Sequence, residues 1–178
     1  MIRRRSRASF GTALGAAALL AFAAATQGQA VSPPAATGSA DRIVIEKAAH
    51  RMTLFSGSRA IARYRVSLGR GGLAPKAREG DRRTPEGDYR ITGRNSNSAY
   101  HRSLRIGYPT PAQAAEARRR GVKPGGDIMI HGLPNGRGAF AKLFAGQDWT
   151  DGCIAVTDPE MDEIWRLTRD GAAVHIAP

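Results

Sequence analysis

The first half of the chain alternates apolar and polar positions in a way typical of half-buried strands. Residues 51–55 and 61–68 place apolar side chains at every second position, and residues 42–46 form a short apolar run before them. The small residues 56–58 indicate a turn between two of these segments. We therefore expect a meander of antiparallel strands with one buried face.

Two later segments carry the start and stop signals of helices. Residues 111–120 have Pro111 in the first turn and a glycine directly after the last residue. In the second segment, Thr157 and Glu160 have the spacing of a capping box. This helix is expected to run to about Arg169, with Gly171 as its stop signal.

Short apolar segments at residues 89–92, 128–130 and 173–176 predict further strands. Residues 69–87 are rich in glycine and charge and predict a long loop. Many strands with two short helices indicate one mainly β domain.

The N-terminal residues have the layout of a secretory signal peptide. Four arginines lie within residues 1–7, an uncharged apolar run covers residues 10–25, and small residues follow at 28–30. The apolar run is shorter than the roughly 20 residues that a membrane-spanning helix needs. No cysteine follows it to carry a lipid. The pair at residues 4–5 also fits a twin-arginine signal, but a plain basic segment is the simpler interpretation.

We therefore expect a signal peptide over residues 1–30, a linker rich in proline and small residues over 31–40, and a single domain over 41–178. The protein is expected to reach the periplasm or cell envelope. Without residues 1–30, the chain has 23 basic and 15 acidic side chains, a net charge of +8. This charge suits an anionic envelope polymer or lipid surface. The basic residues show no aromatic interleaving and no nucleic-acid-binding motif, which excludes nucleic acid as the preferred partner.

Cys153 is the single cysteine, within the stretch DWTDGCIAV at residues 148–156. A single cysteine excludes an internal disulfide, and in an exported protein it indicates a reactive thiol or a bond to another chain. The alternative is a buried apolar filler, since free cysteines are often buried. Gly152 removes side-chain bulk before the thiol, so main-chain N–H groups there could face an oxyanion.

A thiol nucleophile needs a base or a lowered pKa. His131 is the best candidate base, because it ends the apolar segment 128–130 and precedes Gly132, whose carbonyl could orient the ring. The other histidines have structural interpretations. We expect His50 in a hairpin turn, His101 in a surface loop, and His175 at a sheet edge or partly buried.

Four motifs follow one another in a fixed order: GDRRTPEGDYRI at 80–91, YP at 108–109, PGGDIMIHG at 124–132 and TDGCIAV at 150–156. Together they resemble the L,D-transpeptidase catalytic domain, the YkuD family of peptidoglycan cross-linking enzymes. The resemblance covers roughly residues 41–177. It implies a β-sandwich built from mixed sheets with two short helices.

The resemblance also implies the catalytic roles. Cys153 matches the nucleophile, His131 the general base, and the carbonyl of Gly132 the group that orients the imidazole. The N–H groups of Gly152 and Cys153 match the oxyanion hole. A zinc site is disfavoured, since His131 and Cys153 lack partners at ligand spacing.

For substrate binding, Thr150 matches the Ser/Thr that opens the cysteine motif. Tyr108 and the loop at residues 80–87 correspond to positions near the family's substrate cleft.

Two residues depart from the family pattern. Asp151 replaces the usual histidine before the glycine, and we expect it to face solvent or an arginine. Ala155 replaces the usual arginine two residues after the cysteine. Arg137 or Lys142 could compensate for that arginine, although ordinary solvated charge is the simpler interpretation for each.

The implied function is an exported L,D-transpeptidase. Its expected partners are peptidoglycan tetrapeptide stems as donor, and an amine of a second stem or of an envelope protein as acceptor. We expect a monomer that needs no cofactor. Two alternatives remain open: an L,D-carboxypeptidase or amide hydrolase with the same residues, and a non-catalytic wall-binding module.

Overall fold

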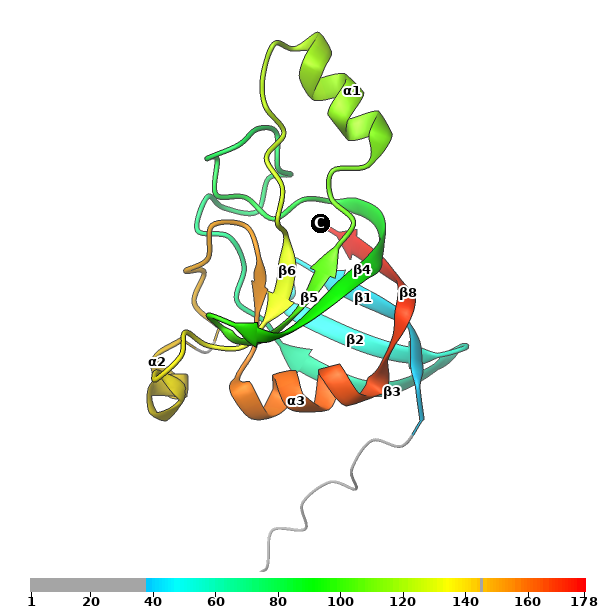
Figure 1. Ribbon diagram of the computed structural model, residues 1–178, viewed down its shortest axis with the longest axis vertical. Helices are drawn as coiled ribbons and strands as arrows, with labels where there is room; N and C mark the ends of the chain where they lie inside the picture. Colours follow the sequence, from blue (N-terminus) through cyan, green and yellow to red (C-terminus); the bar gives the residue numbers. More distant parts are fainter. Residues whose placement is uncertain (1–37, 145) are drawn as a thin grey trace, which may run out of the picture. The chain divides into compact units, whose positions relative to one another are not determined.

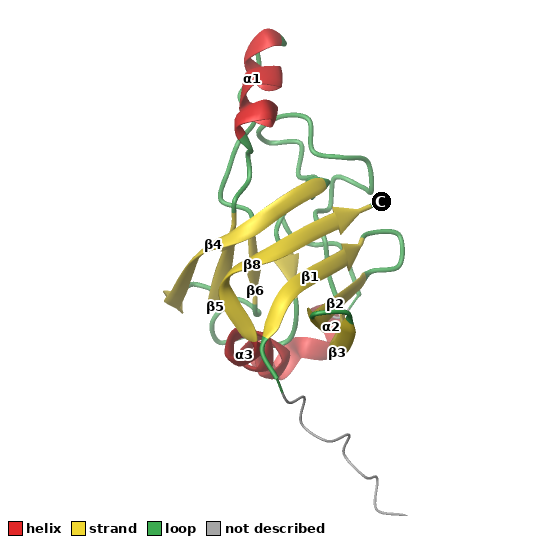
Figure 2. Ribbon diagram, turned by 90° about the vertical axis from the view of Figure 1, so that its right-hand side faces the viewer, coloured by secondary structure: helices red, strands yellow, loops and turns green. Residues whose placement is uncertain are grey.

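The long strand β4 (Gly87–Ser98) joins the two halves of one mixed sheet (Figures 1 and 2). The computed structural model describes residues 38–144 and 146–178, so the predicted signal peptide and most of the predicted linker lie outside the described residues. Among these residues, the sheet has eight strands in the order β3-β2-β1-β8-β4-β5-β6-β7. The first four residues of β4 pair with β8 (Thr168–Ala177), and its remainder pairs with β5 (His101–Ile106).

The first half of the sheet contains the predicted meander. Strands β1 (Ala40–Glu46), β2 (Arg51–Ser56) and β3 (Arg59–Arg65) are antiparallel neighbours, as the alternation predicted. Strand β8 pairs parallel to β1, which makes this half mixed. The predicted linker ended at residue 40, but Ala40 is already a fully buried residue of β1.

The second half of the sheet brings two distant segments of the chain side by side. Strand β6 (Met129–His131) pairs antiparallel with β5 and parallel with β7 (Ile154–Ala155). In the β6–β7 pair, Ile130 lies opposite Ile154 and His131 opposite Ala155. This register places the histidine motif beside the cysteine motif.

The core lies between the two halves and is closed by helix α3 (Asp158–Leu167). Met161, Ile164 and Leu167 of this helix are fully buried in the same cluster as the inward residues of the strands. Glu160 accepts a hydrogen bond from the main-chain N–H of Thr157 at 2.9 Å, as the capping-box spacing predicted. The predicted mainly β fold with a mixed sheet is confirmed.

The helices differ from the prediction in number and in one boundary. Helix α1 (Pro111–Arg119) was predicted, whereas the short helix α2 (Ala141–Phe144) and the 3₁₀ turn η1 (Gly138–Phe140) were not. The prediction extended the last helix to about residue 169, but α3 ends at Leu167 and β8 begins at Thr168. Pairing of Thr168 with Ala40 explains this difference, because a sheet partner outweighs local helix preference. None of the described helices combines the length and apolar composition needed to cross a bilayer.

A buried ion pair anchors the end of the predicted loop at residues 69–87. Lys47 is fully buried, and its Nζ donates to Glu86 Oε1 at 2.7 Å and to the carbonyl oxygen of Thr84 at 3.2 Å. The Thr84 hydroxyl in turn accepts from the N–H of Gly69 at 3.0 Å. The two ends of this loop are therefore held together beside the sheet.

Candidate active site

The β6–β7 pair directs His131 and Cys153 into one cleft of ≈ 390 Å³. Residues in register on parallel strands point to the same face, and every second residue along a strand returns to that face. Cys153 directly precedes β7, and its side chain lines the same cleft as the imidazole of His131. The two residues that the sequence singled out are therefore brought together.

The ring of His131 is held in one tautomer. Its Nδ1–H group donates to the carbonyl oxygen of Gly132 at 2.6 Å. Because a carbonyl oxygen can only accept, Nδ1 carries the proton, and the neutral ring presents Nε2 as a base. Burial lowers the pKa of His131 below its ordinary value of 6.5, with the carbonyl of Gly132 opposing this effect. The imidazole is therefore neutral at neutral pH.

The environment of His131 differs from that of the other histidines. His50, His101 and His175 each contact a carboxylate, at 3.1, 2.8 and 2.6 Å respectively. His131 is 4% exposed and instead contacts a main-chain carbonyl. His50 lies in the turn between β1 and β2, as predicted, whereas two predictions were wrong. His101 begins β5 rather than lying in a loop, and His175 is an exposed residue of β8, which lies between β1 and β4 and not at an edge.

Two aromatic side chains surround the imidazole. The ring of Tyr100 lies 4.6 Å from that of His131 between centroids, and the ring of Trp149 lies 5.8 Å away in an edge-on orientation. Both line the cleft. The polar sequence around Tyr100 contains no pattern that would have revealed it, whereas Trp149 lies within the cysteine motif and could have been considered.

The thiol of Cys153 is neutral in this arrangement. Burial raises its pKa above the ordinary value of 9.0, and the carboxylates of Asp127 and Asp151 add to this effect. A backbone hydrogen bond at Met129 and the ammonium of Lys76 act in the opposite direction. The Sγ–H group donates to the carbonyl oxygen of Asp127 at 3.5 Å. The site therefore pairs a neutral thiol with a neutral imidazole, and not a preformed thiolate with an imidazolium.

Two side chains of the segment before Cys153 shape the turn that carries it. Asp148 accepts from the N–H of Leu68 at 2.9 Å and contacts His50. The hydroxyl of Thr150 donates to the carbonyl oxygen of Cys153 at 2.7 Å and accepts from the N–H of Gly152 at 3.1 Å. Thr150 was expected to bind substrate, but its hydroxyl is already used within the turn.

The expected oxyanion hole needs a correction at Gly152. Its N–H group donates to Thr150, so in this structure it is not directed at the cleft. The N–H of Cys153 has no hydrogen-bond partner among the described residues and remains a candidate donor. Gly152 serves a different purpose: its φ is +128°, and a Cβ there would lie 2.8 Å from the carbonyl oxygen of Arg83. Only glycine fits this close approach between the turn and the loop at residues 69–87.

Gly132 is also required by a close approach. A Cβ on Gly132 would lie 2.6 Å from an Asp158 carboxylate oxygen and 2.9 Å from Cβ of His101. The glycine thus lets the segment after β6 pack against α3 and β5 while its carbonyl holds the imidazole.

Tyr108, the second expected substrate-binding residue, does not line the cleft. It is 8% exposed, and its hydroxyl donates to the carbonyl oxygen of Pro124 at 2.9 Å. Burial raises its pKa to about 12. Tyr108 packs edge-on against Tyr89 in the core, so its role is to hold the segment that follows α1.

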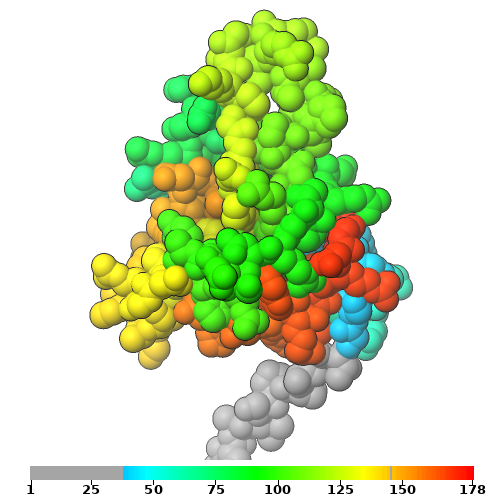
Figure 3. Space-filling view, in the orientation of Figure 1, coloured from blue at the N-terminus to red at the C-terminus, as the bar shows by residue number. Residues whose placement is uncertain are grey.

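Asp151, the first of the two residues that depart from the family pattern, pairs with arginines at the surface. Asp151 faces solvent and contacts the guanidinium groups of Arg70 at 2.9 Å and Arg82 at 3.6 Å, in line with the expectation for this residue. The loop that carries these arginines lies beside the cysteine motif in Figure 3, in teal and green next to orange.

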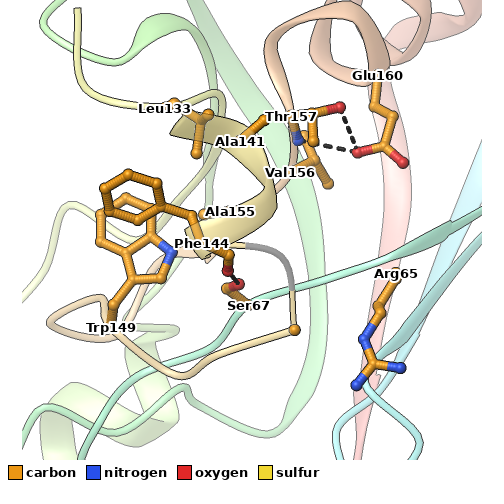
Figure 4. A pocket seen from close by; sticks show the side chains of 11 residues that line it. Arg65, Ser67, Leu133, Ala141, Phe144, Trp149, Ala155, Val156, Thr157 and Glu160 are labelled. Atoms are coloured by element: carbon orange, nitrogen blue, oxygen red, sulfur yellow. Dashed lines mark hydrogen bonds between the residues drawn. The ribbon is translucent and has the colours of Figure 1, made fainter. Parts of the chain in front are cut away.

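Ala155 is buried and lines a small cavity of ≈ 60 Å³ (Figure 4), not the cleft that contains His131 and Cys153. Trp149 lines both spaces. Arg137 and Lys142, which were considered as substitutes for the missing arginine, are exposed and line neither space. Within the described ranges, there is no group of three or more metal-ligating side chains.

The chain is similar to several known proteins in sequence and fold. The family model of the YkuD L,D-transpeptidase catalytic domain matches residues 40–176. The chain is 33% identical over 118 residues to YafK of Escherichia coli K12, whose name assigns it provisionally to the L,D-transpeptidases. This match covers 65% of the chain and 39% of YafK, so the chain spans about two fifths of that relative.

Two solved structures show the same fold. The helical cell shape determining protein Pgp2 of Campylobacter jejuni has a TM-score of 0.59 and 22% identity, over 76% of this chain and 46% of that one. An L,D-transpeptidase of Xylanimonas cellulosilytica has a TM-score of 0.52 and 16% identity, over 79% of this chain and 61% of that one.

Proposed function

The chain belongs to the YkuD family of L,D-transpeptidase catalytic domains, and on this premise we propose that it is an exported cysteine acyltransferase acting on peptidoglycan stem peptides. One observation carries the proposal. His131, with its proton fixed on Nδ1 by Gly132, lines the same cleft as the single cysteine. A neutral imidazole whose Nε2 carries no proton, in the same cleft as a thiol, can serve as the general base that activates a nucleophile.

In the proposed reaction, Nε2 of His131 takes the proton of Cys153 as the sulfur attacks the carbonyl carbon of the third residue of a tetrapeptide stem. The C–N bond to the terminal D-residue breaks, and the imidazolium returns the proton to the departing nitrogen. A thioester forms. An amine then attacks the thioester, His131 removes its proton, and the sulfur leaves and is reprotonated.

The neutral resting pair explains why the base is needed. The thiol pKa is raised and the imidazole pKa is lowered, so proton transfer between them is unfavourable at rest. Transfer has to accompany attack on a bound carbonyl, where the N–H of Cys153 can stabilise the developing oxyanion. This ordering would protect the thiol from oxidation when no substrate is bound, since the thiolate is the reactive form.

The proposed domain organisation follows the sequence. Residues 1–30 direct export, residues 31–40 connect, and residues 41–178 carry the activity at the cell envelope as a monomer. The donor is a tetrapeptide stem, and the acceptor is an amine of a second stem or of an envelope protein. No cofactor is required in this scheme.

The test is product analysis by mass spectrometry with purified protein and a tetrapeptide stem. Cross-linked dimers and free D-Ala are expected from the wild type, with none from Cys153→Ala and at least a hundredfold less from His131→Ala. Free tripeptide without any dimer would replace transfer with hydrolysis. Unchanged substrate, together with Cys153 labelling by a carbapenem that His131→Ala does not slow, would indicate a non-catalytic wall-binding module.

A further inference from the structure

The loop at residues 69–87 forms a second, strongly basic cavity of ≈ 430 Å³. Four arginines line it: Arg70, Arg78, Arg82 and Arg83. Asp81 also lines it, but this carboxylate is already satisfied by Lys76 at 2.8 Å and by the main-chain N–H groups of residues 77, 78 and 83. The arginines therefore present positive charge that the loop itself does not neutralise.

A carboxylate already lies between two of these arginines. Asp151 contacts Arg70 at 2.9 Å and Arg82 at 3.6 Å, and its side chain is 72% exposed. Exposed ion pairs of this kind contribute little to stability, because water and salt screen them. The contact demonstrates that the two guanidinium groups can hold a carboxylate at this place, and that an incoming carboxylate could displace Asp151.

Asp151 connects the basic cavity with the cleft, because it pairs with Arg70 and Arg82 of the cavity and lines the cleft together with Cys153. A residue of extended peptide spans about 3.3–3.6 Å. A stem peptide whose scissile carbonyl lies at the sulfur would therefore bring the carboxylates of its neighbouring residues within reach of this end of the cleft. A tetrapeptide stem carries a free carboxylate on the residue that leaves, one residue beyond the scissile bond.

From these observations we propose that Arg70 and Arg82 form a carboxylate subsite for the donor stem, and that Asp151 occupies this subsite until a substrate carboxylate replaces it. The inference rests on the proposed function and adds a specificity determinant to it. Arg78 and Arg83 supply further positive charge in the same cavity. Arginine suits this task because its planar fork pairs with both oxygens of a carboxylate.

The subsite can be tested by calorimetric titration of the full chain carrying Cys153→Ala, so that binding is measured without turnover. Adding Arg70→Gln and Arg82→Gln should weaken binding of the tetrapeptide stem at least about tenfold, as expected for lost charge-assisted hydrogen bonds. The matched control is Arg59→Gln with Arg118→Gln, which removes the same charge from two exposed arginines outside the cavity. It should change affinity less than about twofold.

The direction in which Asp151→Asn changes peptide affinity decides between competition and a structural role for Asp151. If Asp151 competes with the substrate, this variant binds the stem about two- to fivefold more tightly at low salt, and the gain fades as salt is added. If Asp151→Asn instead weakens binding as much as the arginine variant does, the arginines act only by holding the loop to the turn, and the subsite proposal is wrong.

Peptide variants identify which carboxylate is bound. One peptide is amidated at its terminal carboxylate and a second at its side-chain carboxylates. Only the peptide that lacks the recognised carboxylate should bind the Cys153→Ala protein more weakly, and its affinity should no longer depend on the arginine substitutions. If free and amidated peptides all bind alike, no carboxylate is recognised and the subsite is refuted while the proposed function stands. If no stem peptide binds at all, the proposed function fails and the subsite fails with it.

Discussion

Gly152→Ala is expected to destabilise the protein and to displace Cys153. The new Cβ would lie 2.8 Å from the carbonyl oxygen of Arg83 and 3.2 Å from Cδ1 of Ile128. The Arg83 carbonyl belongs to the main chain, and the following residues are anchored by Lys47, so it cannot simply turn aside. The methyl group must therefore push the cysteine turn and the loop apart.

Two effects lower the free energy of unfolding of Gly152→Ala, and one smaller effect raises it. A φ of +128° strains any residue with a Cβ by about 1–3 kcal/mol. Forcing a methyl group into packed surroundings adds about 1–3 kcal/mol. Alanine restricts the unfolded chain and returns about 0.4–1 kcal/mol. The net loss is about 1–5.6 kcal/mol, to be compared with the roughly 5–15 kcal/mol that stabilises a typical domain.

Gly72→Ala is the matched control. Its φ is +85°, but a Cβ there would meet nothing within 4 Å, so the variant carries backbone strain without the contact. Urea unfolding of both variants gives their free energies of unfolding. The rate of Cys153 alkylation, measured at urea concentrations where the protein is still folded, shows whether the thiol has moved. Equal destabilisation by the two substitutions, or an unchanged alkylation rate in Gly152→Ala, would refute the account of this contact.

Three further predictions concern the ionisable groups. Because burial lowers the pKa of His131, this imidazole is protonated at a higher pH in the unfolded chain than in the folded protein. The free energy of unfolding should therefore fall as pH drops below about 6.5, by up to about 1.4 kcal/mol per pH unit. The urea midpoint of His131→Gln should fall less steeply over the same range. Alkylation of Cys153 by iodoacetamide should keep rising with pH beyond 9.0, because burial raises the thiol pKa; a plateau at acidic pH would instead reveal a thiolate–imidazolium pair. Lys47→Met should cost about 2–4 kcal/mol in urea unfolding by leaving Glu86 unpaired, and adding Glu86→Gln should recover part of it; a double variant as unstable as the single one would contradict this origin.

Local patterns predicted the parts of the fold whose side chains alternate or whose ends carry capping residues. The β1–β3 meander and α1 are of this kind. Strand β5 was missed because its first residues are charged or polar, and Ser103 becomes buried only through pairing with His131 in β6. The outer part of β4 is equally polar and is a strand because β5 supplies its hydrogen bonds.

For the candidate site, the sequence identified the chemically distinctive residues but not their supporting contacts. Cys153 and His131 stand out by type and by their neighbouring glycines, and both line one cleft. The use of the Gly152 amide by Thr150, and the place of Tyr108 in the core, depend on contacts that spacing does not encode. Tyr100 is brought to His131 by the β4–β5 hairpin, across thirty-one positions of the chain.

The β4–β5 hairpin also has a practical consequence for engineering. Its stem is fixed by the core, where Ile91 faces Ile106, while its tip around residues 95–100 is polar, exposed and forms a wall of the cleft. Tips of this kind tolerate insertions and substitutions that a core cannot. A library confined to the side chains of residues 95–98 could therefore reshape this wall of the cleft, while Cys153 and His131 lie on other segments. Tyr100 is left unchanged, because its ring packs against His131 and its carbonyl oxygen accepts from the N–H of Gly132 at 3.1 Å.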